Sequence, residues 1–391
     1  MLKKLLIVQF MGLAILAFVV PAIAQEKDKG YGFNESFPEL HVFLTNQFYN
    51  YQEKAFGDYA DEGDPKIAGH SVFIPMSGYI DISSSIRPGL KAEVEFELYK
   101  AEKLKFCKLR GVWSPRQWFI LSIGRDFVPI GSQDKSYYPT SGYRMFTVAP
   151  FLYRSIMRAC GWWDSGVHVS GEIPVKNTQK LLYNLSIING PGWDSTKTGS
   201  TTTTTNYMYE QFHNHSRQAM DNNNDKPLVM RLTYSPCKGL EFGGSHFKAK
   251  YDQDEKYSCD FTFYHLLYDS DKWNVACEYG KTGRDVGTNI NPEKCSTIDK
   301  KIHQSSAYLA ASYKLLKDKK YVHFLAPAIR YEIFDPWEED ASNKGDRQSI
   351  TYGINLSPYE HFVIRAAYQH TTEKGAELKN DGMSVESVFE F

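Results

Sequence analysis

The feature that most constrains the fold of this chain is the alternation of apolar and polar residues in segments of about ten residues. The clearest segment spans residues 90–98. One of its faces carries Leu90, Ala92, Val94, Phe96 and Leu98. The other face carries Lys91, Glu93, Glu95 and Glu97. Because successive side chains of a strand point to opposite sides of a sheet, we expect a strand with one apolar and one polar face.

Segments of this kind recur along the whole chain and are separated by turn residues. They cover residues 40–51, 72–86, 90–98, 106–113, 118–124, 161–173, 181–189, 228–234, 240–250, 257–267, 273–281, 304–315, 321–334, 348–356, 362–371 and 383–391. Connections after the even-numbered segments are short, and those after the odd-numbered segments are mostly long and polar. This pattern predicts a closed antiparallel transmembrane β-barrel of about 16 strands, all-β in class, with short periplasmic turns and long extracellular loops.

The N-terminus predicts export. Lys3 and Lys4 precede the apolar residues 5–20, and an Ala-x-Ala cleavage pattern ends at Ala24. These features are typical of a signal peptide, here residues 1–24. The alternative, an uncleaved anchor, is disfavoured by the charged residues 26–29. We expect a single barrel domain over residues 25–391, located in the bacterial outer membrane.

The last segment also indicates an outer-membrane barrel. Its apolar face carries Met383, Val385, Phe389 and Phe391. A terminal phenylalanine on an alternating strand resembles the signal that outer-membrane proteins present for barrel insertion. We therefore expect Phe389 and Phe391 to serve as this signal to a barrel-assembly machinery of a Gram-negative cell.

Composition excludes several other classes. Outside the N-terminal segment no apolar stretch reaches eighteen residues, which argues against a spanning helix. Removal of Lys3 and Lys4 changes the net charge from −1 to −3, so nucleic acid is not an expected partner. The aromatic content of 15% suits the interfacial girdles of a membrane barrel. We also considered a soluble all-β secreted protein, but no blade repeat of a β-propeller occurs.

The cysteines form no metal-binding pattern, and no cofactor is expected. Cys107, Cys160, Cys237, Cys259, Cys277 and Cys295 contain no C-x-x-C pair. We expect separate small residues in strands, with a Cys259–Cys295 or Cys107–Cys160 bridge left open. No catalytic motif such as G-x-S-x-G or H-E-x-x-H is present, so we do not expect an enzyme.

A barrel of sixteen strands is too wide for side chains to fill, so an aqueous channel is expected. Its polar faces would then line water. The predicted lumen wall comprises Glu93, Glu95, Glu97, Lys108, Arg110, Arg231, Arg330 and Arg365, with Asp81, Glu278 and Glu332 as further candidates. The glutamates of the third segment would oppose the cations of the fourth on neighbouring strands.

The connection between residues 124 and 161 is unusually long and shows no helical period. Connections of this length in compact domains are usually functional. Its basic residues, with one near its start, are Arg125, Lys135, Arg144, Arg154 and Arg158. As the third long loop it is expected to narrow the pore, and these residues could contact anions at the constriction. Alternatively, they pair with carboxylates of the wall and hold the loop in place.

Several motifs resemble the phosphate-selective porin family typified by porins O and P. Residues 123–131, Ile-Gly-Arg-Asp-Phe-Val-Pro-Ile-Gly, are similar to that family's G-(Q/R)-x-(F/K)-x-P-F-G stretch, with Ile130 in place of the aromatic residue. Residues 158–171 are similar to its R-x-x-G-V-x-x-x-G run, and residues 91–96 and 183–190 also fit. The resemblance is closest over residues 90–190. It implies a sixteen-stranded, trimeric porin with the third loop folded into the lumen.

We therefore expect an outer-membrane porin for passive diffusion of small hydrophilic solutes or ions, with an anion or phosphate preference left open. Arginines of the predicted wall are scattered among acids and form no ladder. The alternative is a barrel with a plugged lumen whose loops bind a partner or act as a surface antigen or adhesin. That alternative rests on the long polar connection over residues 190–225, which contains the run Thr201–Thr205.

Overall fold

The computed structural model describes only part of the chain. The described residues are 39–51, 71–99, 103–139, 141–156, 161–176, 178–191, 223–251, 255, 257–285, 301–336, 338, 346–374 and 380–391. The expected signal peptide, the threonine run, Arg158, Cys160 and Cys295 lie outside them. No helix among the described residues is long and apolar enough to cross a membrane.

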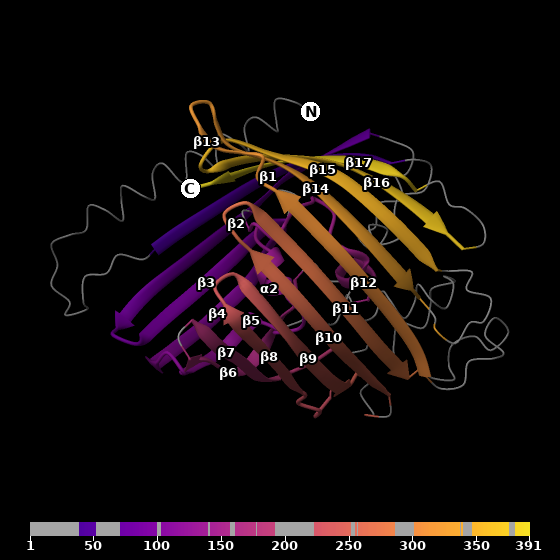
Figure 1. Ribbon diagram of the computed structural model, residues 1–391. Coiled ribbons are helices and arrows are strands. Elements are labelled where there is room, and N and C mark those ends of the chain that lie inside the picture. Colours follow the sequence, from indigo (N-terminus) through magenta and orange to yellow (C-terminus); the bar gives the residue numbers. More distant parts are fainter. Residues whose placement is uncertain are drawn as a thin grey trace, which may run out of the picture. The chain divides into compact units, whose positions relative to one another are not determined.

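Strands make up nearly all of the described chain (Figure 1). They are β1 Glu39–Tyr51, β2 Ser71–Arg87, β3 Leu90–Tyr99, β4 Lys103–Arg116, β5 Phe119–Phe127, β6 Trp163–Lys176, β7 Gln179–Ile188, β8 Leu228–Cys237, β9 Leu240–Lys250, β10 Ser258–Asp269, β11 Trp273–Asp285, β12 Lys301–Tyr313, β13 Leu316–Lys319, β14 Val322–Asp335, β15 Arg347–Tyr359, β16 Phe362–Glu373 and β17 Gly382–Glu390. Two short helical turns, α2 Gln133–Ser136 and η3 Leu152–Ile156, lie between β5 and β6.

The strands form a closed antiparallel ring. Each strand pairs with its neighbour in sequence, except that β12 pairs directly with β14 and the short β13 pairs with the first residues of β14. The ring therefore has sixteen positions, as predicted. It closes where β1 pairs with β17, with Gln47 opposite Glu386. Val42 and Phe391 exchange backbone hydrogen bonds of 2.9 and 3.0 Å at this seam.

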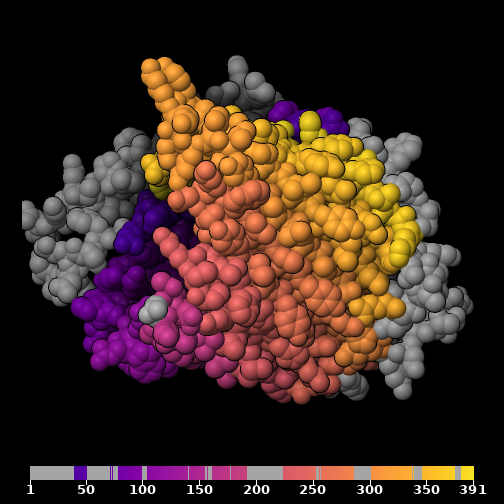
Figure 2. Space-filling model, in the orientation of Figure 1, coloured from indigo at the N-terminus to yellow at the C-terminus, as the bar shows by residue number. Residues whose placement is uncertain are grey.

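The two faces of the wall are inverted relative to a soluble protein. Along β14, Ile329, Tyr331 and Ile333 are exposed on the outside, whereas Arg330 and Glu332 between them are buried on the inside. Apolar residues that face outward and polar residues that face inward are the pattern of a lipid-facing barrel. Figure 2 shows the continuous outer surface that β8–β16 form.

The two ends of the barrel differ. At one end, here called the turn end, most consecutive strands are joined by two or three residues. Gly89 and Gly239 occupy two of these turns with φ of 76° and 84°, a conformation that glycine adopts without strain. The other end, where the strands on either side of each longer connection end and begin, is here called the loop end. One departure from the prediction is the β13 hairpin, which lengthens a connection at the turn end (Figure 1).

Candidate functional site

The described residues of the connection between β5 and β6 lie inside the barrel. We call these residues, 128–139, 141–156 and 161–162, the lumen loop. Its apolar side chains are almost completely buried, with Val128, Phe151 and Trp162 at 0% exposure. They pack on inward-facing aromatic residues of the wall: the Trp162 ring lies 5.1 Å from that of Phe247. A loop in water beyond the strand ends would expose these residues, so their burial reflects the place of the loop in the lumen.

The start of the loop is fixed to β9, β11 and β12. The Gly131 amide donates to Ser245 Oγ at 2.8 Å, and the Ser132 amide donates to Glu278 Oε2 at 3.1 Å. The hydroxyls of Ser132, Tyr153 and Tyr308 also donate to the carboxylate of Glu278. A buried carboxylate is tolerated only when its oxygens accept hydrogen bonds. Four donors meet that condition here, and three of them come from the lumen loop.

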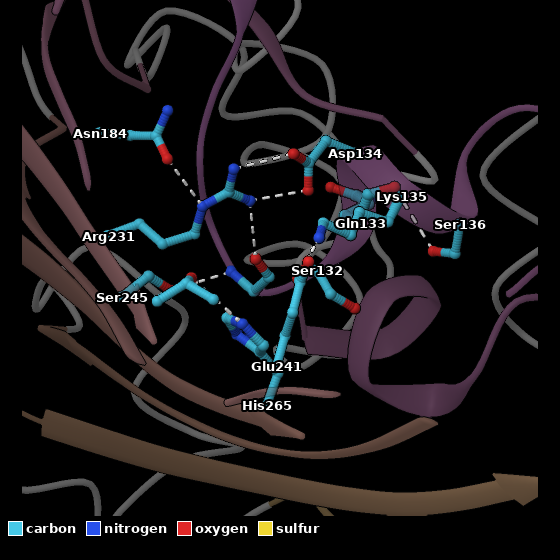
Figure 3. Close-up of polar contacts among 12 residues, drawn as sticks. Ser132, Gln133, Asp134, Lys135, Ser136, Asn184, Arg231, Glu241, Ser245 and His265 are labelled. Carbon is cyan, nitrogen blue, oxygen red and sulfur yellow. Dashed lines mark hydrogen bonds and ion pairs between the residues drawn. The ribbon is translucent and has the colours of Figure 1, made fainter. Parts of the chain in front are cut away.

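A second attachment joins helix α2 to β8 (Figure 3). Arg231 donates to both oxygens of Asp134, with Nη1–Oδ1 and Nη2–Oδ2 distances of 2.7 and 2.8 Å. Arg231 Nη1 also donates to the Gly131 carbonyl, and Nε donates to Asn184. Burial alone would raise the pKa of Asp134, but the charge and hydrogen bonds of Arg231 outweigh it and hold the pKa below its usual 3.8. Beside it, Lys135 pairs with Glu241 of β9.

The middle of the loop is tied to the seam between the first and last strands. Arg144 Nη2 donates to Glu386 Oε1 at 2.8 Å, and Arg144 Nη1 donates to the Tyr137 carbonyl. Glu386 also accepts from Arg365 on β16 and from Gln47 on β1, each at 3.0 Å. Arg365 in turn donates to the Pro139 carbonyl of the loop. A single carboxylate thus joins three strands to the loop.

The end of the loop rests on β14 in the same manner. Arg154 Nη2 lies 3.2 Å from Glu332 Oε1, and the Phe151 amide donates to Glu332 Oε2 at 2.9 Å. The Arg154 guanidinium lies 4.1 Å from the centre of the Phe151 ring, which is a cation–π contact. Arg330 donates to the Val148 carbonyl at 2.7 Å. Nearly all of these groups are shielded from water.

The wall formed by β2–β5 carries opposed charges in cross-strand register. Glu93 lies opposite Arg110, and Glu95 lies opposite Lys108. Lys108 Nζ is 2.7 Å from Glu95 Oε2, and Tyr138 of the lumen loop donates to the same oxygen at 2.6 Å. Arg110 also pairs with Asp126 of β5. Glu97 accepts from Tyr79 at 3.3 Å and from the Cys107 thiol at 3.9 Å.

Water reaches the two sides of the lumen loop unequally. The ion pairs on β14–β17 have side-chain exposures of 0–4% on the wall. By contrast, six charged side chains toward β2–β9 are 18–31% exposed. These are Asp81, Glu93, Arg110, Asp134, Lys135 and Glu241. We call these six residues the charged strip, and they mark the side on which the lumen is open to water.

The structure brings together some, but not all, of the predicted pore cations. Lys135, Arg144 and Arg154 lie in the lumen, each next to a carboxylate of the wall. Arg125 instead lies on the outward face: it pairs in register with Leu109, which is 54% exposed, and its Nε donates to the Phe106 carbonyl. Strand alternation explains this, because Gly124 occupies the inward position. Arg158 lies outside the described residues.

The predicted wall residues lie on the inner face, where they contact the loop, one another or, for Glu97, the neighbouring Tyr79 and Cys107. Among the insertion-signal residues, Phe389 stacks on Phe362 with ring centres 4.4 Å apart, and the Phe391 backbone completes the seam. Cys237, Cys259 and Cys277 are free thiols. Sequence reasoning missed the serine and tyrosine hydroxyls that hold the loop, because isolated hydroxyl residues in a loop form no periodic pattern.

Solved structures with the same architecture are outer-membrane proteins. An anion-selective porin from Comamonas acidovorans superposes with a TM-score of 0.56 at 14% identity, covering 91% of this chain and 100% of that chain. The fold is that of the outer-membrane porins. The outer membrane channel DcaP of Acinetobacter baumannii gives 0.55 at 11% identity, covering 90% and 97%. Outer-membrane expressed OmpT of Vibrio cholerae gives 0.56 at 10% identity, covering 92% and 100%.

Comparison with family models found no match, and neither did comparison with curated proteins. The solved structures are similar to this chain in fold, at identities of 10–14%. Membership in the phosphate-selective porin family therefore stays a prediction.

Proposed function

We propose that this protein is a channel for passive diffusion of small hydrophilic solutes and ions across the outer membrane of a Gram-negative bacterium. The observation that carries the proposal is the lumen loop, which is fixed inside a closed sixteen-stranded wall and leaves the charged strip open to water. A polar, water-filled interior is the property that distinguishes a porin from a barrel filled by side chains.

The solute path follows the charged strip, between the lumen loop and the wall of β2–β9. Arg110 and Lys135 lie among four carboxylates there, so charges of both signs face the path. Selectivity in such a pore depends on its width and on rings of charge. Because these cations are paired with carboxylates, the geometry favours weak charge selectivity over strong selection of phosphate. The Comamonas acidovorans protein is described as anion-selective, and an anion preference is the finer hypothesis to test.

The outward apolar face supports location in the outer membrane. Cleavage of the predicted signal peptide, residues 1–24, is part of the same proposal. We further propose a homotrimer, since a trimer form of OmpT of Vibrio cholerae has a similar fold, with a TM-score of 0.56. Analytical ultracentrifugation in detergent tests this directly: a monomer at all protein concentrations contradicts it.

A second candidate is a barrel with a closed lumen whose outer loops bind a partner. One observation favours it: the apolar cluster that includes Phe151, Trp162, Phe247 and Phe263 fills the lumen beside β9–β11 without water-exposed surface. Under this alternative the loop would be a plug. The long connection over residues 192–222, the expected binding element, lies outside the described residues.

Conductance in planar lipid bilayers separates the two candidates. We expect stepwise conductance increases from purified, folded protein, and a small reversal potential in a salt gradient. Folded protein that inserts but never conducts would overturn the channel proposal and support the plug. Deletion of residues 196–222 is the matched variant: it should leave conductance intact, whereas partner binding to cells would be lost. Block of chloride current by added phosphate would show the finer anion preference.

A further inference from the structure

One connection at the turn end departs from the tight turns around it. Between β12 and β14 the chain runs through residues 314–321, and β13 pairs there with the start of β14. Lys319 lies opposite Val322, and Leu316 lies opposite Leu325. We call residues 314–323 the turn-end hairpin. It projects beyond the surface of the barrel (Figures 1 and 2).

The turn-end hairpin is strongly basic in a chain of nearly balanced charge. Residues 314–320, which run from its base to its tip, contain four lysines and Asp318, a net charge of +3 within seven residues, whereas the whole chain carries −1. Lys317 lies 3.9 Å from Asp271, and Asp318 lies 3.3 Å from His323. Among the described residues, no ion pair joins Lys314, Lys319 or Lys320 to a carboxylate. The hairpin therefore presents uncompensated positive charge.

Apolar and aromatic side chains accompany these lysines. Leu315, Leu316 and Tyr321 of the hairpin are exposed, Tyr321 at 75%. At its base, the outward Trp273 packs against Tyr313 with ring centres 4.7 Å apart. Tryptophan and tyrosine gather at the level of lipid headgroups, because their rings are apolar at one end and polar at the other. The base of the hairpin is thus at the height of the membrane interface.

The direction of the hairpin follows from the tilt of the strands. Strands of membrane barrels are tilted by about 35–45° from the barrel axis. A hairpin that continues such a strand beyond the rim therefore leaves the wall along a tangent to the barrel. It then passes over the surrounding lipid and not over the lumen. The four residues of β13 extend about 13 Å along the strand direction. At that tilt this corresponds to roughly 9–11 Å of height above the rim. Lysine side chains are long and flexible, so their ammonium groups can reach back over this distance to the headgroups.

We propose that the turn-end hairpin binds the phosphate groups of anionic phospholipids in the leaflet that faces the periplasm. The lysines supply the charge, Leu315 and Leu316 near the base lie at the interface between headgroups and acyl chains, and Tyr321 at the tip reaches the headgroups. The assignment of this leaflet rests on the proposed function, with the turn end toward the periplasm. Lipid is favoured over an anionic cell-wall polymer because the apolar residues would gain nothing from a hydrated polymer.

The test uses the full chain in vesicles of equal parts phosphatidylglycerol and phosphatidylcholine. After gentle extraction, mass spectrometry measures the ratio of the two lipids that remain bound. We expect phosphatidylglycerol to be enriched on the wild type and the enrichment to fall in K317Q/K319Q/K320Q and at high salt. A lysine close to an anionic surface changes the partition by roughly fivefold, so the loss should be at least of that size. Both leaflets have the same composition, so the orientation of insertion does not affect the result.

The matched control removes three exposed lysines at the loop end, K226Q/K248Q/K374Q, and should retain the enrichment of the wild type. Heat-modifiable migration in gels verifies that each variant is folded. Equal enrichment in K317Q/K319Q/K320Q and wild type, or equal loss in the control, overturns the proposal. The proposal is also overturned if no lipid preference is found and the wild type, but not K317Q/K319Q/K320Q, sediments with purified cell-wall sacculi. The wall polymer would then be the partner. Conductance of the same preparations is measured separately, so loss of conductance with intact lipid preference contradicts only the channel.

Discussion

The guanidinium of Arg144 lies 2.8 Å from the carboxylate of Glu386, and this contact joins the lumen loop to the last strand of the barrel. Arg365 and Gln47 donate to the same carboxylate from the two neighbouring strands. The position of the loop and the closure of the ring therefore depend on a shared group. Contacts of this kind favour a fixed constriction over a mobile one.

Replacement of Glu386 should destabilise the barrel at its seam. In Glu386→Gln the buried guanidinium of Arg365 and the partly buried one of Arg144 lose their counter-charge, and breaking a buried pair in this way costs about 3–5 kcal/mol. We expect a lower temperature for the loss of heat-modifiable migration and noisier single-channel currents. Glu241→Gln is the control: its partner Lys135 is 31% exposed, and such pairs contribute about 1 kcal/mol or less. Equal effects of the two variants would contradict the assigned role of Glu386.

Acid should release helix α2 from β8 only below the ordinary range of a carboxyl group. The pKa of Asp134 is lowered in the folded protein, so its contribution to stability is fully present above pH 3.8 and is lost as the pH falls through the folded value. The attachment of α2 to β8 should therefore contribute no change in single-channel conductance down to pH 3.8. Asp134→Asn should weaken the attachment by about 1 kcal/mol at neutral pH and abolish the acid step attributed to this group. An acid transition that persists unchanged in Asp134→Asn would assign it to another residue.

Charge selectivity should respond to exposed cations of the lumen and not to buried ones. Lys135→Gln removes a charge from the charged strip, so we expect the reversal potential in a salt gradient to shift toward cations. Arg154→Ala should mainly lower thermal stability, because Arg154 is only 4% exposed and paired with Glu332. Arg125→Gln on the outward face is the control and should leave the reversal potential unchanged. A shift in Arg125→Gln equal to that in Lys135→Gln would contradict the placement of both residues.

Gly131 should be intolerant of any side chain. Its φ of 60° is left-handed, and a Cβ there would lie 2.7 Å from the Tyr153 hydroxyl and 2.9 Å from the Glu278 carboxylate. Gly131→Ala should cost about 1–2 kcal/mol from the backbone alone and disturb the attachment of the loop to Glu278. Thermal unfolding and conductance both measure this. Gly111→Ala, where nothing lies within 4 Å of the new methyl group, should resemble the wild type.

The fold could be predicted largely from sequence because lipid outside and water inside impose a two-residue period on every strand. Sixteen predicted segments match the sixteen positions of the ring, with bounds shifted by a few residues. The glutamates of β3 and the cations of β4 likewise meet as opposed charges, since both lie on the polar face. The β13 hairpin was not predicted, because its lysines are typical of a polar turn between strands.

The site was less predictable because it depends on which wall residue each loop residue meets. The basic residues of the loop were evident, but their pairing with Glu241, Glu332 and Glu386 requires the path of the loop across the lumen. Arg125 shows the opposite case. Its outward direction follows from the alternation of Leu121, Ile123 and Arg125, whereas its charge and its place beside the loop favoured a position in the pore.

The seam between β1 and β17 has a consequence for how the barrel is made. Gln47 and Glu386 meet across 339 positions of sequence, so this pairing has the highest contact order in the wall and should be the slowest to form. Until it forms, two strand edges carry unsatisfied amides and carbonyls that hydrocarbon cannot solvate. An incomplete ring is thus unstable in lipid. A protein that catalyses barrel assembly and covers both strand edges would have to release β1 and β17 together. Glu386 accepts from Gln47 only once the ring has closed, so the carboxylate that holds Arg144 gains its last partner at the final step of assembly.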